Sequence, residues 1–212
     1  MAGTVSVKAV VIIRTLLYAA ITITSFIIFV PVAISMGKFS GDCLLYSTKV
    51  TGIHITFGSE SNCVYIIATS VVFNLVFGLV LTGSGVVTLI GRPNPLSDLT
   101  SLPFLLNVFL DGLSCAFIFI SGCILSVGLK ETCDAITSGS CSSAAVKVSG
   151  GSTYFFYGHL STAQVAVWVS FILWLAQLGV ALFTLWRLGK LCCGRYTTSS
   201  ETPTQQTPTN QF

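Results

Sequence analysis

Four long apolar segments dominate this sequence and restrict what it can fold into. They cover about 10–34, 64–90, 104–128 and 161–186. Each is long enough to cross a bilayer, which takes roughly 20 apolar residues. Only 8% of the residues are charged, whereas a soluble domain carries about 25%. Because so few charges do not cover a water-facing surface, the sequence predicts an all-α membrane protein, a four-transmembrane-helix bundle whose successive helices run antiparallel.

The chain divides into a transmembrane domain at 1–195 and a tail at 196–212. The tail is rich in Thr, Ser, Gln and Pro, which predicts a disordered segment.

The first apolar run continues to Ile34 without a convincing cleavage site, so we expect an uncleaved signal-anchor helix. Lys and Arg are enriched on the cytosolic flanks of membrane spans. Both termini are therefore predicted to be cytosolic, with basic flanks at Lys8, Arg14, Arg92, Arg187, Lys190 and Arg195.

With this orientation, four cysteines lie in the two loops that face an oxidising compartment. Cys43 and Cys63 bracket the first outer loop, and Cys133 and Cys141 lie in the second. Disulfides persist in such a compartment, so we expect Cys43–Cys63 and Cys133–Cys141, although four cysteines allow three pairings. A zinc site is the alternative, but the spacings lack a close ligand pair such as CxxC. The expected membrane is the plasma membrane or that of secretory or endosomal vesicles.

Two further cysteines, Cys192 and Cys193, directly follow the fourth span. They lie beside Arg187, Lys190 and Arg195, and this juxtamembrane setting favours S-palmitoylation. Two unmodified thiols are the alternative interpretation.

The outer loops contain two short patterns of interest. Ile53-His54-Ile55-Thr56-Phe57 alternates apolar and polar residues, which predicts a strand. With Leu44-Leu45-Tyr46 it predicts a small antiparallel sheet stapled by Cys43–Cys63, because a sheet of this size is marginal alone. In the second outer loop, the aromatic cluster Tyr154-Phe155-Phe156-Tyr157 is expected at the headgroup level. A partner-binding patch is the alternative there.

Asp111 is the one carboxylate inside a predicted span. An ionised Asp at the bilayer centre costs about 2.5–3.5 kcal/mol on an insertion scale, so such a residue usually faces the bundle interior. We expect an interhelical polar contact, with Asn107 one turn earlier or with Asn74 as the partner. An ion path or proton relay is the functional alternative. Arg14, near the start of the first span, is expected to extend to the headgroups.

Other polar and small residues within the spans predict helix contacts. Two glutamines of the fourth span, Gln164 and Gln177, are expected to hydrogen-bond to neighbouring helices. Small residues four positions apart allow close helix approach, either inside the bundle or with another membrane protein. The two such pairs are Gly78/Thr82 and Gly112/Ala116.

The sequence shows no catalytic motif. HExxH, a phosphate-binding glycine loop, Gly-x-Ser-x-Gly and a hydrolytic pair of acids are all missing. We therefore expect no enzymatic activity and no cofactor. The net charge of +3 is scattered along the chain, which gives no argument for nucleic acid. The expected partners are the lipid bilayer and other membrane proteins.

Three stretches resemble the transmembrane protein 179 family. The first, Gly37-Lys38-Phe39-Ser40-Gly41-Asp42-Cys43-Leu44-Leu45-Tyr46, is similar to a Gly-x-Phe-x-Gly-x-Cys-x-Leu signature. The others are Cys123–Cys141 and the stretch from Phe156-Tyr157 to Gln164 and Trp168. The resemblance leans to the B-type branch and implies a claudin-like membrane protein without an established biochemical role. The Trp-rich motif of true claudins is missing from the first outer loop, so barrier formation is not carried over.

These observations favour a non-enzymatic tetraspan adaptor that organises or traffics other membrane proteins. The alternative is a small channel, transporter or accessory subunit that uses Asp111. Adhesion between cells through the outer loops is a third possibility, but no charged or aromatic motif in those loops supports it.

Overall fold

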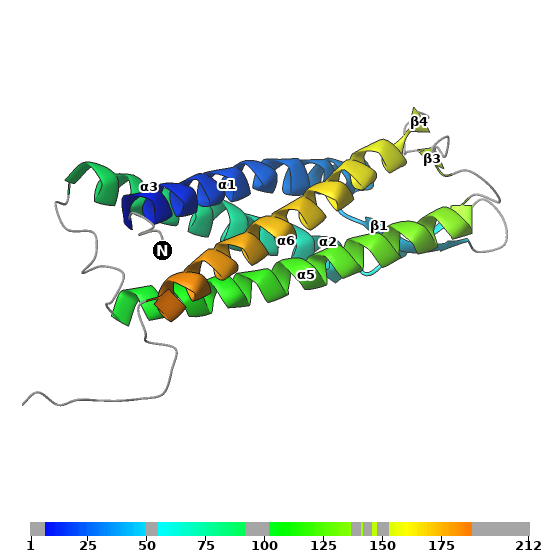
Figure 1. Ribbon diagram of the computed structural model, residues 1–212. Coiled ribbons are helices and arrows are strands. Elements are labelled where there is room, and N and C mark those ends of the chain that lie inside the picture. The colour runs from blue at the N-terminus through cyan, green and yellow to red at the C-terminus, as the bar shows by residue number, and fades with distance from the viewer. Residues whose placement is uncertain are drawn as a thin grey trace, which may run out of the picture.

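Four long helices form the structure, as the apolar segments predict (Figure 1). This is a computed structural model, and it describes residues 7–49, 55–91, 102–136, 141, 146–147 and 153–187. The four spans are α1 (Val7–Lys38), a composite second span (Glu60–Gly91), α5 (Leu102–Ile136) and α6 (Phe156–Arg187). Each has the length and hydropathy of a membrane-spanning helix.

The second span is not a uniform α-helix. It consists of α2 (Glu60–Thr69), the π-helical segment η1 (Ser70–Phe77) and α3 (Gly78–Gly91). A π-helix bonds each amide to the carbonyl five residues earlier, and it is rare, short and frequent at functional sites. In η1 the two buried residues are Ser70 and Asn74. The wider turn therefore brings two polar side chains, four positions apart, to the interior of the bundle.

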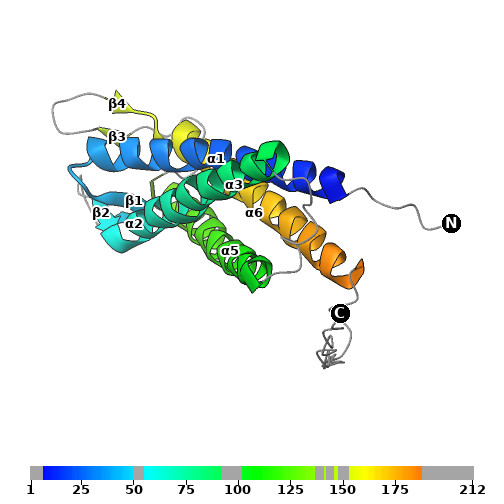
Figure 2. The same cartoon turned by 90° about the vertical axis from the view of Figure 1, so that its left-hand side faces the viewer.

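The spans form a ring in which each has two neighbours (Figure 2). The first span, α1, packs against the second span on one side and against α6 on the other, and α5 packs against α6 and α2. Consequently α1 and α5 lie across the bundle from each other, and so do η1 and α6. This ring order decides which polar contacts have to cross the bundle axis.

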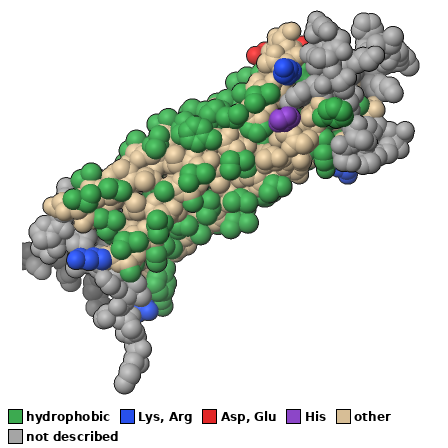
Figure 3. Space-filling model, turned by 90° about the horizontal axis from the view of Figure 1, so that it is seen from above, with side chains coloured by type: hydrophobic (Ala, Val, Ile, Leu, Met, Phe, Trp, Pro, Cys, Tyr) green, Lys and Arg blue, Asp and Glu red, His purple; other side chains and the backbone are tan. Residues whose placement is uncertain are grey.

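Apolar side chains fill the interior and also cover the outside of the bundle. The largest fully buried ones include Trp174, Ile21, Ile118 and Leu125. On the outside, many Leu, Val, Ile and Phe side chains are exposed, and hydrophobic atoms extend along the shaft while charged atoms lie toward its ends (Figure 3). A surface of this kind faces lipid.

The helices extend beyond the predicted spans, mainly at the end that carries the disulfides. The third helix was expected to end at residue 128, but α5 continues to Ile136, about two turns further. The extension is held by packing, since Leu129 and Thr132 are buried and Thr132 hydrogen-bonds to Leu44 of the first outer loop. Hydropathy finds the lipid-facing part of a helix and misses such an extension.

The predicted sheet and its staple are both confirmed. The strands β1 (Cys43–Lys49) and β2 (Ile55–Gly58) pair antiparallel, with Thr48 opposite Thr56. The disulfide Cys43–Cys63 joins β1 to the first turn of α2. The remaining residues of the expected strand, Ile53 and His54, lie outside the described residues.

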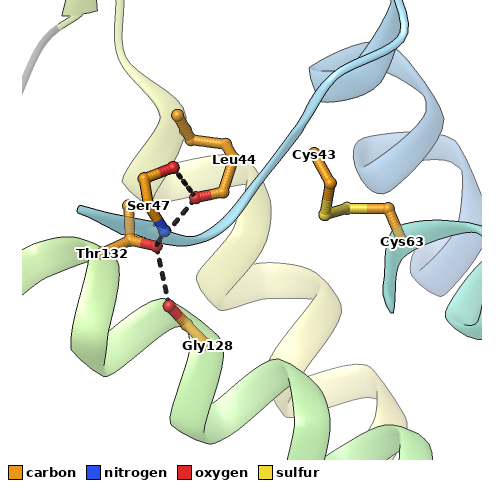
Figure 4. Close-up of a disulfide and its surroundings, with 6 residues drawn as sticks. All are labelled: Cys43, Leu44, Ser47, Cys63, Gly128 and Thr132. Atoms are coloured by element: carbon orange, nitrogen blue, oxygen red, sulfur yellow. Dashed lines mark hydrogen bonds between the residues drawn. A yellow bond between two sulfur atoms is a disulfide. The ribbon is translucent and has the colours of Figure 1, made fainter. Parts of the chain in front are cut away.

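The sheet is docked on α5 by backbone and hydroxyl contacts (Figure 4). The Thr132 hydroxyl donates to the Leu44 carbonyl at 2.8 Å and accepts from the Ser47 amide at 3.3 Å. One turn earlier, Gly128 leaves room for the ring of Tyr46, because an added Cβ would come within 2.8 Å of that ring. Tyr46 has φ 62°, a left-handed conformation that a bulky residue rarely adopts.

The second outer loop also has a disulfide, between Cys133 of α5 and Cys141. The described part of the loop contains a second small antiparallel pair, β3 (Val146–Lys147) and β4 (Thr153–Tyr154). In the aromatic cluster at this point, the described side chains of Phe155 and Phe156 differ in exposure. Phe155 is 61% exposed, but Phe156 is fully buried in the hydrophobic core. Phe156 begins α6 and packs inward, so it is not a lipid-exposed anchor, and the headgroup level of the cluster stays a prediction.

Candidate functional site: a polar core inside the bundle

Asp111 lies at the centre of a hydrogen-bonded cluster inside the bundle. It belongs to α5 and has no exposed surface. Its carboxylate accepts from the Arg14 guanidinium at 3.1 Å and from the Tyr18 hydroxyl at 2.8 Å. Arg14 and Tyr18 are four residues apart on α1, so both side chains project from one face of that helix. Arg14 also donates to the Tyr18 hydroxyl at 2.9 Å.

These partners differ from those expected from the sequence. Asp111 makes the predicted kind of contact, between helices, but among the described residues its hydrogen bonds are with Arg14 and Tyr18 rather than Asn107 or Asn74. The expected headgroup position of Arg14 is also wrong, because its side chain is only 11% exposed and turns inward. The Asp111 carboxylate lies within reach, and its charge-assisted hydrogen bond holds the guanidinium inside the bundle rather than among the lipid headgroups.

Gln177 of α6 closes the cluster from a third helix. It is fully buried. In the amide orientation that its neighbours require, its oxygen accepts from the Arg14 Nε at 2.8 Å and lies 2.8 Å from the Tyr18 hydroxyl, whose one hydrogen is shared between Gln177 and Asp111. The prediction that Gln177 hydrogen-bonds between helices is thus correct. The cluster Arg14, Tyr18, Asp111 and Gln177, here called the charged strut, connects α1, α5 and α6.

A second, neutral cluster surrounds Asn74 of η1. The Asn74 amide oxygen accepts from the Trp174 indole at 2.8 Å, and its nitrogen donates to the Ser170 hydroxyl at 2.9 Å. All three residues are fully buried. Buried polar groups need hydrogen-bond partners, and here the three side chains provide them for one another. This cluster, the neutral strut, connects η1 to α6, and the π-helical turn is what aims Asn74 at them.

The two struts cross inside the bundle. The charged strut joins the diagonal pair α1 and α5, and the neutral strut joins the diagonal pair η1 and α6. They also touch, because the rings of Tyr18 and Trp174 meet edge to face with centroids 6.0 Å apart. The polar core is therefore one connected unit to which all four spans contribute.

Neighbouring helices are joined by further polar contacts closer to the disulfide end. Thr69 and Ser121 share a hydrogen bond at 2.8 Å between α2 and α5. The Ser126 hydroxyl accepts from both Gln164 and Trp168, at 3.1 Å each, which confirms the interhelical contact expected of Gln164. Such bonds are each worth about 0.6 kcal/mol on average in a membrane protein.

The two predicted small-residue pairs serve different purposes. Gly78 lets the second span approach α1, since an added Cβ there would lie 2.5 Å from the Thr22 hydroxyl. Gly85, seven residues later, faces Thr15 in the same way. In contrast, an added Cβ at Gly112 would meet nothing within 4 Å, and Ala116 is exposed. The second pair faces outward.

Asp111, Asn74 and Gln177 are predictable from the sequence as polar contacts within the bundle, but their partners Tyr18 and Trp174 are not. For Arg14, the sequence signal that could have identified it as a partner of Asp111 was its opposite charge in another predicted span. The expected lipidation residues, Cys192 and Cys193, and the predicted tail at 196–212 lie outside the described residues.

Comparisons with known proteins agree with the fold. The family model described as the transmembrane protein 179/179B claudin domain matches residues 10–204. Transmembrane protein 179B of Danio rerio is 33% identical, over 76% of this chain and 77% of the relative. No solved structure matches the chain. A four-span bundle with a disulfide-stapled sheet, matched by this model over nearly its full length, identifies the chain as a multi-pass membrane protein that belongs to the transmembrane protein 179/179B claudin-domain family.

Proposed function

We propose that this protein is a non-enzymatic tetraspan adaptor that binds other membrane proteins side by side and organises or traffics them. The observation that carries the proposal is the open small-residue face of α5. Gly112 and Ala116 are directed outward, and an added Cβ at Gly112 would meet no other atom within 4 Å. Small residues four apart let a second helix approach closely in a membrane.

The surroundings of this face fit a helix contact. Phe109, Leu113 and Ile120 flank the small residues on α5 and are 68%, 38% and 45% exposed. Large side chains on either side of a small-residue groove give an arriving helix surfaces to pack against, and packing is what drives helix association in lipid. We call Phe109, Gly112, Leu113, Ala116 and Ile120 the α5 face.

An ion path through Asp111 has less support. Its carboxylate is fully buried and is engaged by Arg14 and Tyr18. A transport site usually has discontinuous helices whose unwound backbone lines a cavity, whereas α5 is one continuous helix from Leu102 to Ile136. The geometry fits an internal brace better than a conduction pathway.

The test is chemical crosslinking in cell membranes, followed by purification in mild detergent and identification of proteins recovered in stoichiometric amount. Gly112→Leu and Ala116→Leu fill the α5 face. Gly179→Leu on α6 is the matched control, because Gly179 is also open to the outside and gains the same helix propensity.

A membrane protein recovered with the wild type and with Gly179→Leu, but lost with Gly112→Leu, would support the adaptor and identify its client. Recovery of the protein alone under crosslinking would count against it. A partner that is retained by both α5 variants would bind elsewhere and would remove the α5 face from the proposal.

A further inference from the structure

A groove runs between α1 and α6 in the half of the bundle that carries the disulfides. Two residues of α1, Thr24 and Ile27, and five residues of α6 from Ser161 to Val169 line it. Its volume is about 400 Å³, and small-molecule sites have volumes of about 300–1,000 Å³. The groove lies toward the disulfide end because α6 starts at that end and α1 finishes there (Figure 1).

The groove opens on the lipid-facing surface of the bundle. Ile27, Val165 and Val169 are exposed along it, whereas Thr24 and Ala166 are buried and form its floor. Because the surroundings are lipid rather than water, the occupant comes from the bilayer. Among the described residues that line the groove, none is charged. A phosphate or carboxylate group would be buried there without a partner, so the groove fits a neutral lipid.

The walls of the groove favour a rigid occupant. Five of the seven lining residues are β-branched: Thr24, Ile27, Thr162, Val165 and Val169. Such side chains have few χ1 conformations, so the walls are largely pre-formed. A fused-ring lipid loses little conformational freedom against walls of this kind, whereas a flexible acyl chain has to give up its rotations.

The polar side chains that line the groove are available as hydrogen-bond acceptors, because their hydrogens are already used. Ser161 and Thr162 both donate to the Gly158 carbonyl, at 3.3 and 2.8 Å. Thr24 donates to the Ile21 carbonyl at 2.7 Å. A hydroxyl that donates its hydrogen keeps its oxygen lone pairs as acceptors. A ligand that bonds to these groups therefore has to bring a donor.

Pro31 adds a backbone acceptor beside the groove. It lies inside α1, and proline has no N–H, so the Ile27 carbonyl four residues earlier lacks its usual helical donor. This carbonyl points toward the carboxyl end of α1, which is the end of the groove where Ser161 and Thr162 lie. In a membrane, a carbonyl freed by proline is satisfied by a neighbouring group. A donor on the ligand would fill that role.

We propose that this groove is a sterol site. The sterol hydroxyl donates to the acceptors at the end formed by Ser161, Thr162 and the Ile27 carbonyl. The fused rings lie along Ile27, Val165 and Val169. The apolar segment of the fourth span begins at about residue 161, so the hydroxyl lies at the edge of the hydrocarbon region. The site is separate from the α5 face and does not depend on the adaptor function.

The test is photolabelling of the full-length chain with a diazirine analogue of cholesterol in phosphatidylcholine vesicles. Labelled peptides are identified by mass spectrometry, and unlabelled cholesterol is the competitor. We expect saturable labelling of α1 near Ile27 and of α6 between Ser161 and Val169. Ceramide and diacylglycerol are also neutral lipids with a donor, and they should displace the probe less well than cholesterol does.

Two variants remove acceptors without crowding the bundle. Ser161→Ala/Thr162→Val deletes the two hydroxyls, and Pro31→Ala returns the missing backbone N–H. Each should weaken half-saturation of labelling about threefold, which corresponds to one average hydrogen bond in a membrane. The matched control is Ser84→Ala/Thr88→Val on α3. Those hydroxyls also donate to carbonyls of their own helix, both at 2.9 Å, and they do not line the groove.

The thermal midpoint in detergent separates loss of the site from loss of the fold. Pro31→Ala should keep or raise it, because proline inside a helix is destabilising. Four results would overturn the sterol site: labelling that cholesterol does not displace, labelling that maps outside the groove, equal half-saturation for Ser161→Ala/Thr162→Val and its control, or stronger displacement by ceramide or diacylglycerol than by cholesterol.

Discussion

The Arg14 guanidinium and the Asp111 carboxylate meet at 3.1 Å across the diagonal of the bundle, although the helices that carry them are not neighbours in the ring of spans. The Tyr18 hydroxyl is what completes this contact, because it accepts from Arg14 and donates to Asp111. In most four-helix bundles the side chains at the axis are apolar. Here an ion pair and a phenol occupy that place, and several predictions about stability depend on them.

Tyr18→Phe removes one hydroxyl and keeps the ring. Asp111 then loses a donor and Arg14 loses an acceptor in a buried position, which costs about 1–3 kcal/mol. For a chain of this length, each kcal/mol lowers the thermal midpoint by about 2–4 °C. Thermal unfolding in detergent measures the change. Tyr65→Phe, in α2, is the control, and equal midpoints for the two variants would contradict the importance of the phenol.

Asn74→Leu breaks the neutral strut at nearly constant volume. The Trp174 indole and the Ser170 hydroxyl are then buried without the partner that they have in the structure. We expect a loss of about 1–3 kcal/mol, measured by thermal unfolding. Asn107→Leu on α5 provides the comparison, since Asn107 is only half-buried. A drop of the same size in both variants would mean that the strut adds nothing specific.

Gly128→Leu tests the packing of the first outer loop against α5. The new side chain would enter the space of the Tyr46 ring and the Leu45 side chain, and overpacking of this kind costs about 1–3 kcal/mol. We expect faster proteolysis of the loop and a lower thermal midpoint. Gly83→Leu on α3 has open space around it and should leave both measurements unchanged.

The two disulfides are expected to contribute unequally. Cys43 and Cys63 are 20 residues apart, and Cys133 and Cys141 are 8 apart. In the chain-entropy model the longer loop stabilises by about 3 kcal/mol and the shorter by about 2.5 kcal/mol. Replacing each pair by serines and measuring thermal unfolding should give the larger loss for Cys43–Cys63. The opposite order would show that native packing, rather than loop closure, dominates.

Acylation of Cys192 and Cys193 remains a prediction from sequence, based on their juxtamembrane position. Acyl-exchange labelling of the wild-type chain should give a signal that the Cys192→Ser/Cys193→Ser double variant loses. Labelling that persists in the double variant would place any acyl group on another cysteine. No labelling in the wild type would leave two free thiols there.

Sequence reasoning predicts the bundle, the sheet and the staple because each depends on local or compositional signals. Hydropathy predicts four spans, and the alternation around Ile55 predicts a strand. The disulfides are predicted because the cysteines lie in loops that are expected to face an oxidising compartment. The details that escape it depend on packing between segments. The extension of α5 to Ile136 requires a loop on which Thr132 can bond.

The same distinction applies to the polar core. A lone Asp111 in an apolar segment signals an interior polar contact, but nothing local tells which of several polar residues will reach it. Arg14 lies near a helix start, where extension to the headgroups is the ordinary expectation. The π-helical turn that aims Asn74 inward has no reliable sequence signature, and without it the partner Trp174 is not predictable.

The disulfide between Cys43 and Cys63 determines what limited proteolysis of the first outer loop releases. Cys43 lies just after α1, and Cys63 lies in the first turn of α2, so the first outer loop is a covalently closed ring. A protease that nicks the chain between them leaves the first span tied to the rest of the molecule. The cut is invisible on a non-reducing gel and releases an amino-terminal fragment only after a thiol reductant is added.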